Sequence, residues 1–475
     1  MRESVSCPGL VPLRARMPPS GREGECVNHK DLVKQARDAK VRLVRFLYCD
    51  FSGVTRGKAV HVAHLAAKTR EGVGLTRAQM AINLLEDMVE IEGMEPVGEI
   101  RLVPDPETFS ILPWTPSSAG MLCDQLNHHG ANWGACPRSF LKEIIGRADR
   151  LGFSVQASFE NEFYLAREQE GAYVPFDHAP VYSSIGLDLS ANVIHETLEA
   201  LEVQGLVVEQ AINEYGAGQQ EISIRHAPAL RAADNQIKLR DAVRGVALRH
   251  GLLASFAPKP FPDQIGSGCH LHISVWDREV SRNLLYAPSD PRGLSDLGRH
   301  FIGGILHNLP ALLALTCPSY NSYRRLQPHA WSSAYTSWGL DNREAAMRVA
   351  SPFWGREEQT YNMELKCVDG SANPYLALGA LIACGLDGIE RSLSPGEPCE
   401  VDPASLGDDE RQARGIRRLP TTMGEALDYL AANRLLQDAM GELMGRAYLK
   451  VRRAEEASFA AQDLDYEIRN HFYKF

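Results

Sequence analysis

The sequence predicts an α+β fold, with a small amino-terminal domain followed by a larger domain that is built on a curved sheet. The first observation is length, because 475 residues can bury more than one core and should divide into at least two domains. The second is a series of segments in which apolar and polar residues alternate, separated by helical segments. The third is that several of these strands carry charge on one face, so the sheet must curve around a polar site.

The amino-terminal part predicts an extension followed by a small domain. Residues 1–28 contain Pro, Gly and Arg with little apolar periodicity, and they predict a disordered or loosely attached extension. Residues 29–125 are expected to form the small domain. A short helix is expected over 30–39, with strands over 41–49 and 54–62 on either side of a turn.

The larger domain is expected to span residues 126–475 and to alternate strands with helices. Pro137 begins an amphipathic helix that Gly152 ends. The expected strands cover residues 153–165, 206–213, 219–225, 268–276 and 361–367. The expected helices cover residues 190–203, 230–250, 294–316 and 373–390. A loop after Glu390 leads to helices from Thr422 to the carboxyl terminus.

Composition argues against several classes of function. The chain is 44% hydrophobic and 23% charged, and it contains no apolar run long enough to cross a bilayer. A formal charge of −10 argues against a nucleic-acid partner. The ten cysteines form no Cys-x-x-Cys pair and the amino terminus lacks the apolar core of a signal peptide, which predicts reduced thiols in a cytoplasmic protein.

A His-x-His pair is the centre of the predicted site. Residues 266–274 read Gly-Ser-Gly-Cys-His-Leu-His-Ile-Ser. The glycines allow a close backbone approach, and His270 and His272 share one face because side chains alternate along a strand. Taken alone, the pair is about as consistent with two half-exposed strand histidines as with a metal or phosphate site.

Acidic residues on other strands favour a metal site. They fall in three groups, namely Glu160 with Glu162, then Glu209, Glu214 and Glu221, and finally Glu364. Carboxylates repel one another unless a cation lies among them, so these groups predict a metal if the strands converge. Oxygen ligands with one histidine suit Mg²⁺ or Mn²⁺ better than Zn²⁺, and two such ions could clamp a phosphoryl group. Arg343 and Arg348 add fixed positive charge for a phosphate.

Seven segments, in order along the chain, resemble the glutamine synthetase family. They are Glu160-Asn-Glu162-Phe-Tyr, Asn213-Glu214 through Gln220-Glu221, Lys259-Pro260-Phe261, Gly266 through His272, Asn321-Ser322-Tyr323-Arg324-Arg325-Leu326, Asn342-Arg343 and Ala372-Asn373-Pro374-Tyr375-Leu376. The resemblance implies a β-grasp-like amino-terminal domain and a catalytic domain with an open antiparallel β-barrel surrounded by helices. It also implies a homo-oligomer, a dodecamer of two hexameric rings with sites between subunits.

The resemblance implies a role for each matching residue. One metal ion would be held by Glu162, Glu214 and Glu221, and the other by Glu160, His270 and Glu364. ATP would face Glu209, His272, Ser274, Arg343 and Arg348. The substrates would be bound by Arg325, Gly266, Lys366 and Trp331, with Arg325 facing the carboxylate of glutamate. Asp50 would act with Arg343 and Trp331 in catalysis, because it matches an ammonium-binding Asp that reaches a neighbouring subunit, although its local sequence is that of a plain turn.

Four positions depart from the ammonia-using pattern of the family. Trp331 stands where those enzymes carry a flap Glu that deprotonates ammonium. Ile265 replaces an Asn that binds the amino group of the substrate, Lys366 an Arg for its α-carboxylate, and Asn362 an Arg for the phosphates. The segment around Trp331 resembles the branch that joins glutamate to organic amines, as γ-glutamylanilide and γ-glutamylamine synthetases do.

The sequence leaves several functions open. The first is an ATP-dependent ligase that joins the γ-carboxylate of glutamate to an organic amine through γ-glutamyl phosphate. An aromatic amine is a candidate because it is uncharged at neutral pH and needs no strong base, although Trp331 is about equally consistent with packing of the flap. The alternatives are ordinary glutamine synthesis with ammonia, a catalytically silent structural or regulatory relative, and a metal-dependent hydrolase.

Overall fold

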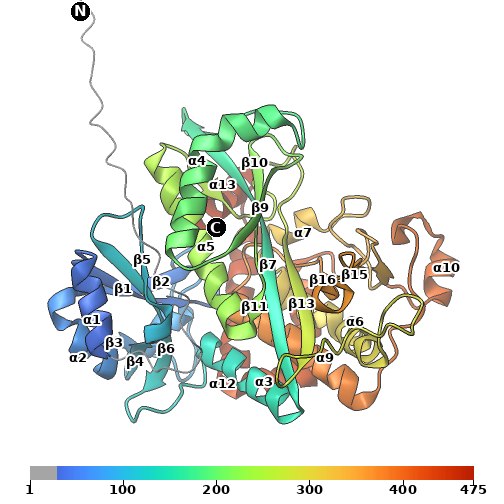
Figure 1. Ribbon diagram of the computed structural model, residues 1–475, viewed down its shortest axis with the longest axis horizontal. Coiled ribbons are helices and arrows are strands. Elements are labelled where there is room, and N and C mark those ends of the chain that lie inside the picture. Colours follow the sequence, from blue (N-terminus) through green and yellow to red (C-terminus); the bar gives the residue numbers. More distant parts are fainter. Residues whose placement is uncertain (1–28) are drawn as a thin grey trace, which may run out of the picture.

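The structure is a computed structural model that describes residues 29–475 and contains two sheets (Figure 1). The predicted extension, residues 1–28, lies outside the described residues. The expected α+β class is confirmed, since a curved, open sheet surrounded by helices follows a smaller sheet in the chain. None of the described helices is both long enough and apolar enough to cross a membrane.

The smaller sheet has six strands in the order β2-β1-β6-β4-β3, with β5 paired to β6. All pairings are antiparallel except that between β1 and β6. The strands are β1 (Leu43–Cys49), β2 (Thr55–His61), β3 (Val73–Thr76), β4 (Glu99–Pro104), β5 (Ser110–Ile111) and β6 (Ser118–Asn127). Helices α1 (His29–Asp38) and α2 (Leu65–Glu71) lie beside it. Val44 and Phe46 alternate with less buried residues along β1, which gives the sheet one apolar face.

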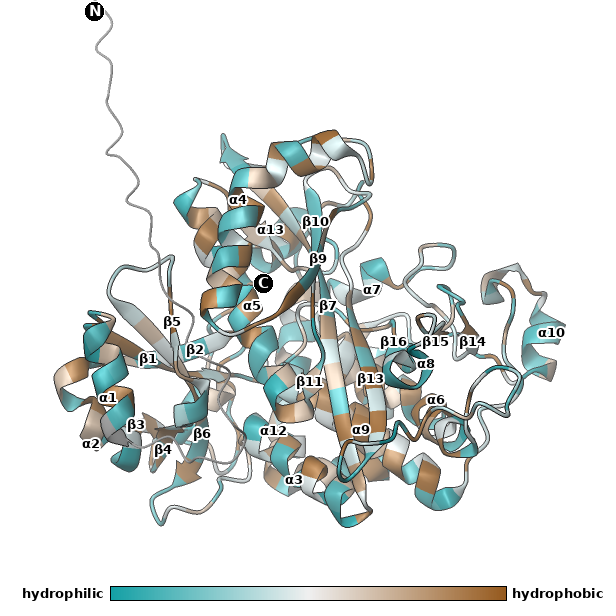
Figure 2. Ribbon diagram, in the orientation of Figure 1, coloured by the Kyte–Doolittle hydropathy of each residue, from teal (hydrophilic) through white to brown (hydrophobic). Residues whose placement is uncertain are grey.

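The larger sheet has ten strands, with β14-β15-β16-β13-β7-β10-β9 as its main path. Its strands are β7 (Phe153–Gln169), β8 (Ala172–Pro175), β9 (Val208–Asn213), β10 (Gln219–Ile224), β11 (Ala227–Pro228), β12 (Leu253–Ser255), β13 (Cys269–Asp277), β14 (Trp338–Leu340), β15 (Met347–Ala350) and β16 (Asn362–Leu365). The long antiparallel pair β7 and β13 runs through the middle of the larger domain, and hydrophobic and hydrophilic residues both occur along β7 (Figures 1 and 2). The five strands expected in this region are confirmed to within a few residues.

Helices cover the outside of the larger sheet. They are α3 (Pro137–Arg150), α4 (Ser184–Val203), α5 (Ala229–Arg249), α6 (Asp296–Thr316), α9 (Pro374–Arg391), α11 (Met423–Ala432), α12 (Arg434–Ala460) and α13 (Leu464–Lys474). The backbones of α6 and α9 touch, because a Cβ on Gly304 would lie 2.1 Å from the Cys384 carbonyl oxygen and one on Gly388 would lie 2.1 Å from that of His300. Glycine is therefore required on both helices.

Two expectations differ from the structure. The segment expected as a loop after Glu390 contains α10 (Asp408–Ala413), whose first turn carries three acids that suit a helix amino terminus. The strands β14 and β15 were not expected, and they pair in parallel. They are only three and four residues long, which is too short for an alternating pattern to be recognised.

Arg138 joins the two sheets through a buried network of charges. It lies on α3, and its guanidinium donates to Asp234 on α5 through two bonds of 3.0 Å, to Asp124 on β6 at 3.0 Å and to Asp105 beyond β4 at 2.7 Å. Its side chain is only 3% exposed. Asp124 has a second cationic partner in Lys142, while Asp234 also accepts from the Tyr375 hydroxyl at 2.8 Å and Asp105 from the Glu107 N–H at 3.1 Å. Arg138 therefore supplies the positive charge that Asp234 and Asp105 share.

We expect Arg138→Ala to lower the free energy of unfolding by about 3–5 kcal/mol, because it leaves the buried Asp234 and the partly buried Asp105 without a counter-charge. Denaturant unfolding followed by circular dichroism measures this change. Arg147→Ala is the matched control, since Arg147 lies on the same helix in a half-exposed pair with Glu390 and should cost about 0–1 kcal/mol. Equal losses for the two variants would contradict the network.

Candidate active site

Strand register brings the predicted metal residues to one face of the larger sheet. β13 pairs with β7 on one side and with β16 on the other, while β10 pairs with the opposite edge of β7. The facing pairs are His270 with Glu160, His272 with Glu364, and Glu221 with Glu162. Side chains opposite one another on neighbouring strands share a face. The carboxylates and imidazoles therefore converge, as the sequence predicts.

The convergent groups form a cluster that can hold a cation. His270 Nδ1 lies 3.1 Å from Glu364 Oε1 and 3.4 Å from Glu160 Oε2. His272 Nε2 lies 3.5 Å from Glu160 Oε2, and ligand atoms of Glu160, His272 and Glu364 all lie within 4.8 Å of one another. Both imidazoles lie beside Glu160, and the expected division, with His270 toward a metal ion and His272 toward ATP, stays a prediction.

The electrostatics of the cluster favour a bound cation. Burial, together with the charges of Glu160 and Glu162, raises the pKa of Glu221 to about 10. Burial and Glu162 raise the pKa of Glu214 to about 7. A divalent ion would remove this repulsion. His272 Nε2 is also buried without a hydrogen bond to any described residue, so the donor set fits a metal that prefers carboxylate oxygen and imidazole nitrogen.

Two cationic side chains balance the charge of Glu364. Arg348 Nε lies 2.9 Å from Glu364 Oε2, and Lys366 Nζ lies 3.5 Å from Glu364 Oε1. Burial alone would raise the pKa of Glu364, but Lys366, the two histidines and Arg348 lower it to about 2. Lys366 is buried and its amine also lies 3.4 Å from His270 Nε2. Its expected contact with the α-carboxylate of a substrate stays a prediction.

The glycine-rich loop before β13 lets Arg325 enter the site. A Cβ on Gly266 would lie 2.7 Å from Arg325 Cγ, and one on Gly268 would lie 2.6 Å from both Arg325 Nη2 and His270 Nε2. The guanidinium donates to the carbonyls of Lys366 and Val368 at 3.2 Å each. Any larger residue at these two positions would displace the arginine, which explains the Gly-Ser-Gly sequence.

A cavity of about 710 Å³ opens beside the cluster and contains all five residues expected to face ATP. They are Glu209, His272, Ser274, Arg343 and Arg348. This volume suits a nucleotide-sized ligand. Glu160 also lines the cavity, which joins it to the cation cluster. Phe353 and Arg356, in the segment after β15, also line the cavity, and neither was predicted from the sequence. The structure draws attention to this segment because the neighbouring aromatic residues Phe353 and Trp354 are both exposed.

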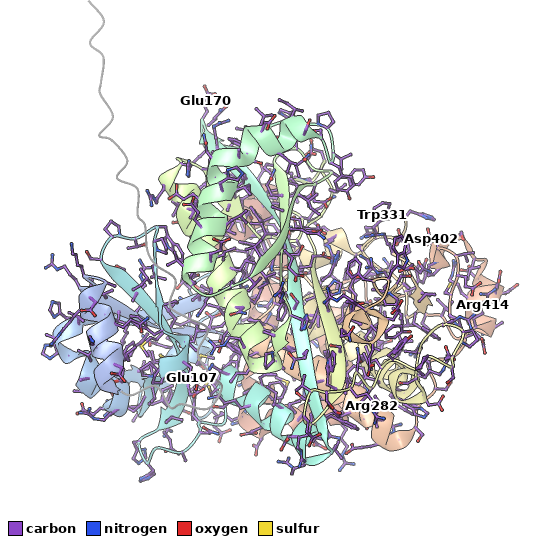
Figure 3. All side chains as sticks on the ribbon, in the orientation of Figure 1. Glu107, Glu170, Arg282, Trp331, Asp402 and Arg414 are labelled. Atoms are coloured by element: carbon purple, nitrogen blue, oxygen red, sulfur yellow. The ribbon has the colours of Figure 1, made fainter. Side chains whose placement is uncertain are left out.

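An aromatic surface lies at the edge of the larger domain, around Trp331 (Figure 3). Trp331 is 52% exposed, and its ring meets that of Tyr215 edge to face at 5.8 Å between centroids. The rings of Tyr215 and Tyr182 also meet, with 5.8 Å between their centroids, and both tyrosines are at least half-exposed. Tyr215 follows the predicted metal ligand Glu214 in the chain, and burial together with the charges of Glu214 and Glu221 raises the pKa of Tyr182. This aromatic surface therefore lies near those two predicted metal ligands.

Asp50 and Ile265 lie in unlike environments. Asp50 is fully buried, pairs with Arg56 at 2.5 Å and accepts from the N–H groups of Ser52 and Val54. The carboxylate is therefore not presented on the surface of the chain, and its role toward a neighbouring subunit stays a prediction. Ile265 is 43% exposed, and its carbonyl accepts from the Tyr164 hydroxyl at 2.8 Å.

Comparison with known proteins identifies the family. The model of the "Glutamine synthetase N-terminal domain" matches residues 27–133, and that of the "Glutamine synthetase, catalytic domain" matches residues 134–471. The chain belongs to the glutamine synthetase family. Members of this family are ATP-dependent ligases that use divalent metal ions, so the chain is an ATP-dependent carboxylate–amine ligase that acts on glutamate.

Relatives with different named activities are similar to this chain. A "Gamma-glutamylpolyamine synthetase GlnA3" of Streptomyces coelicolor is 36% identical, over 94% of this chain and 96% of the relative. A "Glutamine synthetase" of Halobacterium salinarum is 33% identical, over 94% and 97%. Among solved structures, a GmaS/ADP complex superposes with a TM-score of 0.81 at 30% identity, covering 92% of this chain and 98% of that one. The expected amine-ligase branch of the family is thereby supported.

We expect Glu221→Ala to separate stability from metal binding. Removal of one carboxylate relieves repulsion, so the metal-free variant should melt at or above the temperature of the wild type, while stabilisation by Mn²⁺ should be largely lost. Thermal melts across a Mn²⁺ series measure both effects. Glu209→Ala is the control, since Glu209 lies in the cavity and pairs with Arg225. It should keep Mn²⁺ stabilisation and weaken that by ADP.

Proposed function

We propose that this ligase joins the γ-carboxylate of glutamate to an organic amine, giving a γ-glutamyl amide. The observation that carries the proposal is the exposed aromatic surface of Trp331, Tyr215 and Tyr182 beside the cation cluster. Ring faces of this kind bind flat apolar groups by stacking and organic cations through the ring quadrupole. Ammonium could use only the attraction of its charge to the rings, whereas an organic amine also has an apolar group that can pack against them.

The arrangement of charges supports transfer of a phosphoryl group from ATP to glutamate. Arg343 and Arg348 would neutralise phosphate oxygens in the cavity, and Arg325 would bind the glutamate carboxylate. Divalent ions held by the cluster would orient and neutralise the phosphates. The γ-carboxylate becomes an acyl phosphate, and the amine nitrogen then attacks its carbonyl carbon and displaces phosphate. Positioning and charge neutralisation supply most of the catalysis for such a reaction.

Ammonia is the alternative acceptor, because relatives named glutamine synthetase are similar to this chain over most of its length. The flap argues against it. Trp331 provides no carboxylate to bind ammonium, and its half-exposed ring leaves an apolar wall in that place. Among organic amines, the same wall favours those with a flat apolar group.

Other features of the proposal rest on the family resemblance. We propose Mg²⁺ or Mn²⁺ as the ions, a dodecamer of two hexameric rings, and a division into domains near residue 125. A cytoplasmic location rests on the pattern of cysteines. The six carboxylate and imidazole ligands are proposed to hold two ions, Glu162, Glu214 and Glu221 one of them, and Glu160, His270 and Glu364 the other.

We expect the purified enzyme to release phosphate from ATP in the presence of glutamate, Mg²⁺ and an organic amine, and to form the matching γ-glutamyl amide. The panel should contain ammonia, alkylamines, polyamines, ethanolamine and anilines, with products identified by mass spectrometry. A kcat/KM for ammonia above that for every organic amine would refute the proposal. Higher values for alkylamines than for anilines would refute only the preference for a flat apolar group.

We expect Tyr215→Ala to lower kcat/KM for the preferred organic amine by about three- to tenfold, the equivalent of one lost aromatic contact. The KM for ATP should not change, because Tyr215 does not line the cavity that contains the nucleotide residues. Tyr429→Ala removes an aromatic side chain of similar exposure on α11 and serves as the control. A loss for ammonia as large as that for the organic amine would contradict a contact with the organic group.

A further inference from the structure

Attack by an amine that arrives protonated requires a proton acceptor, and the Trp331 side chain does not provide one. An alkylamine or ammonia arrives protonated at neutral pH and must lose a proton before its lone pair can react. The ring of Trp331 accepts no proton at the position where related enzymes carry a carboxylate. Asp50 is fully buried, with Arg56, Ser52 and Val54 already bonded to its oxygens. Neither group is free to act as the base within this chain.

Glu344 lies against the backbone of Trp331, the residue that occupies the position of the flap carboxylate of related enzymes. Its Oε1 accepts a hydrogen bond of 2.8 Å from the backbone N–H of Trp331, and the residue is only 9% exposed. Trp331 has φ of 53°, a left-handed conformation that is uncommon for a bulky residue. The bond from Glu344 therefore helps to hold the flap in the conformation that presents the indole ring.

The segment that carries Glu344 is fixed on both sides. Asn342 accepts from the Glu344 N–H at 3.0 Å and donates to the carbonyls of Cys399 and Val401 at 2.7 and 2.9 Å. The preceding residue, Arg343, lines the cavity assigned to ATP. Glu344 thus lies between Trp331 and the cavity that contains the residues expected to bind ATP.

We infer that Glu344 is the base that takes the proton from the incoming amine, replacing the carboxylate that the flap lacks. The inference rests on the proposed ligase reaction. The ammonium nitrogen transfers one proton to the Glu344 carboxylate, which becomes a carboxylic acid. The freed lone pair forms a bond to the γ-carbonyl carbon, the bond from that carbon to the phosphate oxygen breaks, and the leaving phosphate takes the second proton from nitrogen.

The surroundings of Glu344 suit this role. Burial raises the pKa of the carboxyl group, and Asp402 adds to the increase, whereas the bond from the Trp331 N–H and the charges of His329 and Lys366 oppose it. A carboxylate with a raised pKa is a stronger base. Asp402 is bonded to His329 at 2.6 Å and to the Ala404 N–H at 2.8 Å, so Glu344 is the less engaged of the two carboxylates near the flap.

The test is the variant Glu344→Gln, which keeps an oxygen that can accept from the Trp331 N–H. We expect kcat/KM for alkylamines and ammonia to fall by about 100-fold or more, the usual effect of removing a general base. Formation of γ-glutamyl hydroxamate from hydroxylamine, and of anilides from aniline, should stay close to wild type because these amines are uncharged at neutral pH. The limb of the pH profile that reports the base should disappear for alkylamines.

One further variant, measured for both rate and pH profile, makes the outcome decisive. Asp402→Asn is the matched control. It should retain the rate with alkylamines and keep the limb of the pH profile that reports the base, moved to lower pH because Asp402 adds to the raised pKa of Glu344. Equal losses for charged and uncharged amines in Glu344→Gln, or no loss for either, would overturn the inference, as would transfer of the pH effect to Asp402→Asn. A wild type that uses only ammonia would refute the proposed function and leave this test in place, since ammonium is also protonated.

Discussion

Repulsion between carboxylates on neighbouring strands is the constraint around which the larger domain is arranged. β7, β10, β13 and β16 are paired in a register that aims acidic side chains at one point. Burial of like charges is costly, and the raised pKa values of Glu214 and Glu221 express that cost. Hydrogen bonds along the strands and the helices packed outside the sheet hold the cluster together until a cation binds. The folded chain therefore buries carboxylates whose mutual repulsion a bound cation would relieve.

Residues around the cluster balance its charge and leave space for its side chains. Arg348 and Lys366 balance Glu364, which keeps one carboxylate charged without a metal. Gly266 and Gly268 have no side chain, which leaves room for Arg325 beside His270. The same loop therefore determines the positions of both Arg325, which is proposed to bind glutamate, and His270, which is proposed to bind a metal ion. These close contacts leave little room for a larger residue at either glycine.

The two ends of the site differ in their chemistry. The cavity around Arg343 and Arg348 is polar and charged, as phosphates require, whereas the surface of Trp331, Tyr215 and Tyr182 is aromatic. Glu344 connects them, because it follows Arg343 in the chain and holds the backbone of Trp331. Specificity for the acceptor can therefore change without altering phosphoryl transfer. This separation is consistent with a family that includes relatives named for glutamine and for γ-glutamylpolyamine products.

The sequence by itself determined the fold class, the main strands and helices, and the residues of the cation cluster, because alternation along a strand and periodicity along a helix are local properties. The division of ligands between His270 and His272 depended on register between distant strands. The short strands β14 and β15 carry too few residues to show a pattern. Only the tertiary structure could bring Tyr182 and Tyr215 to Trp331, bury Asp50 against Arg56, or place Glu344 behind the flap, since these contacts join segments that no local pattern relates.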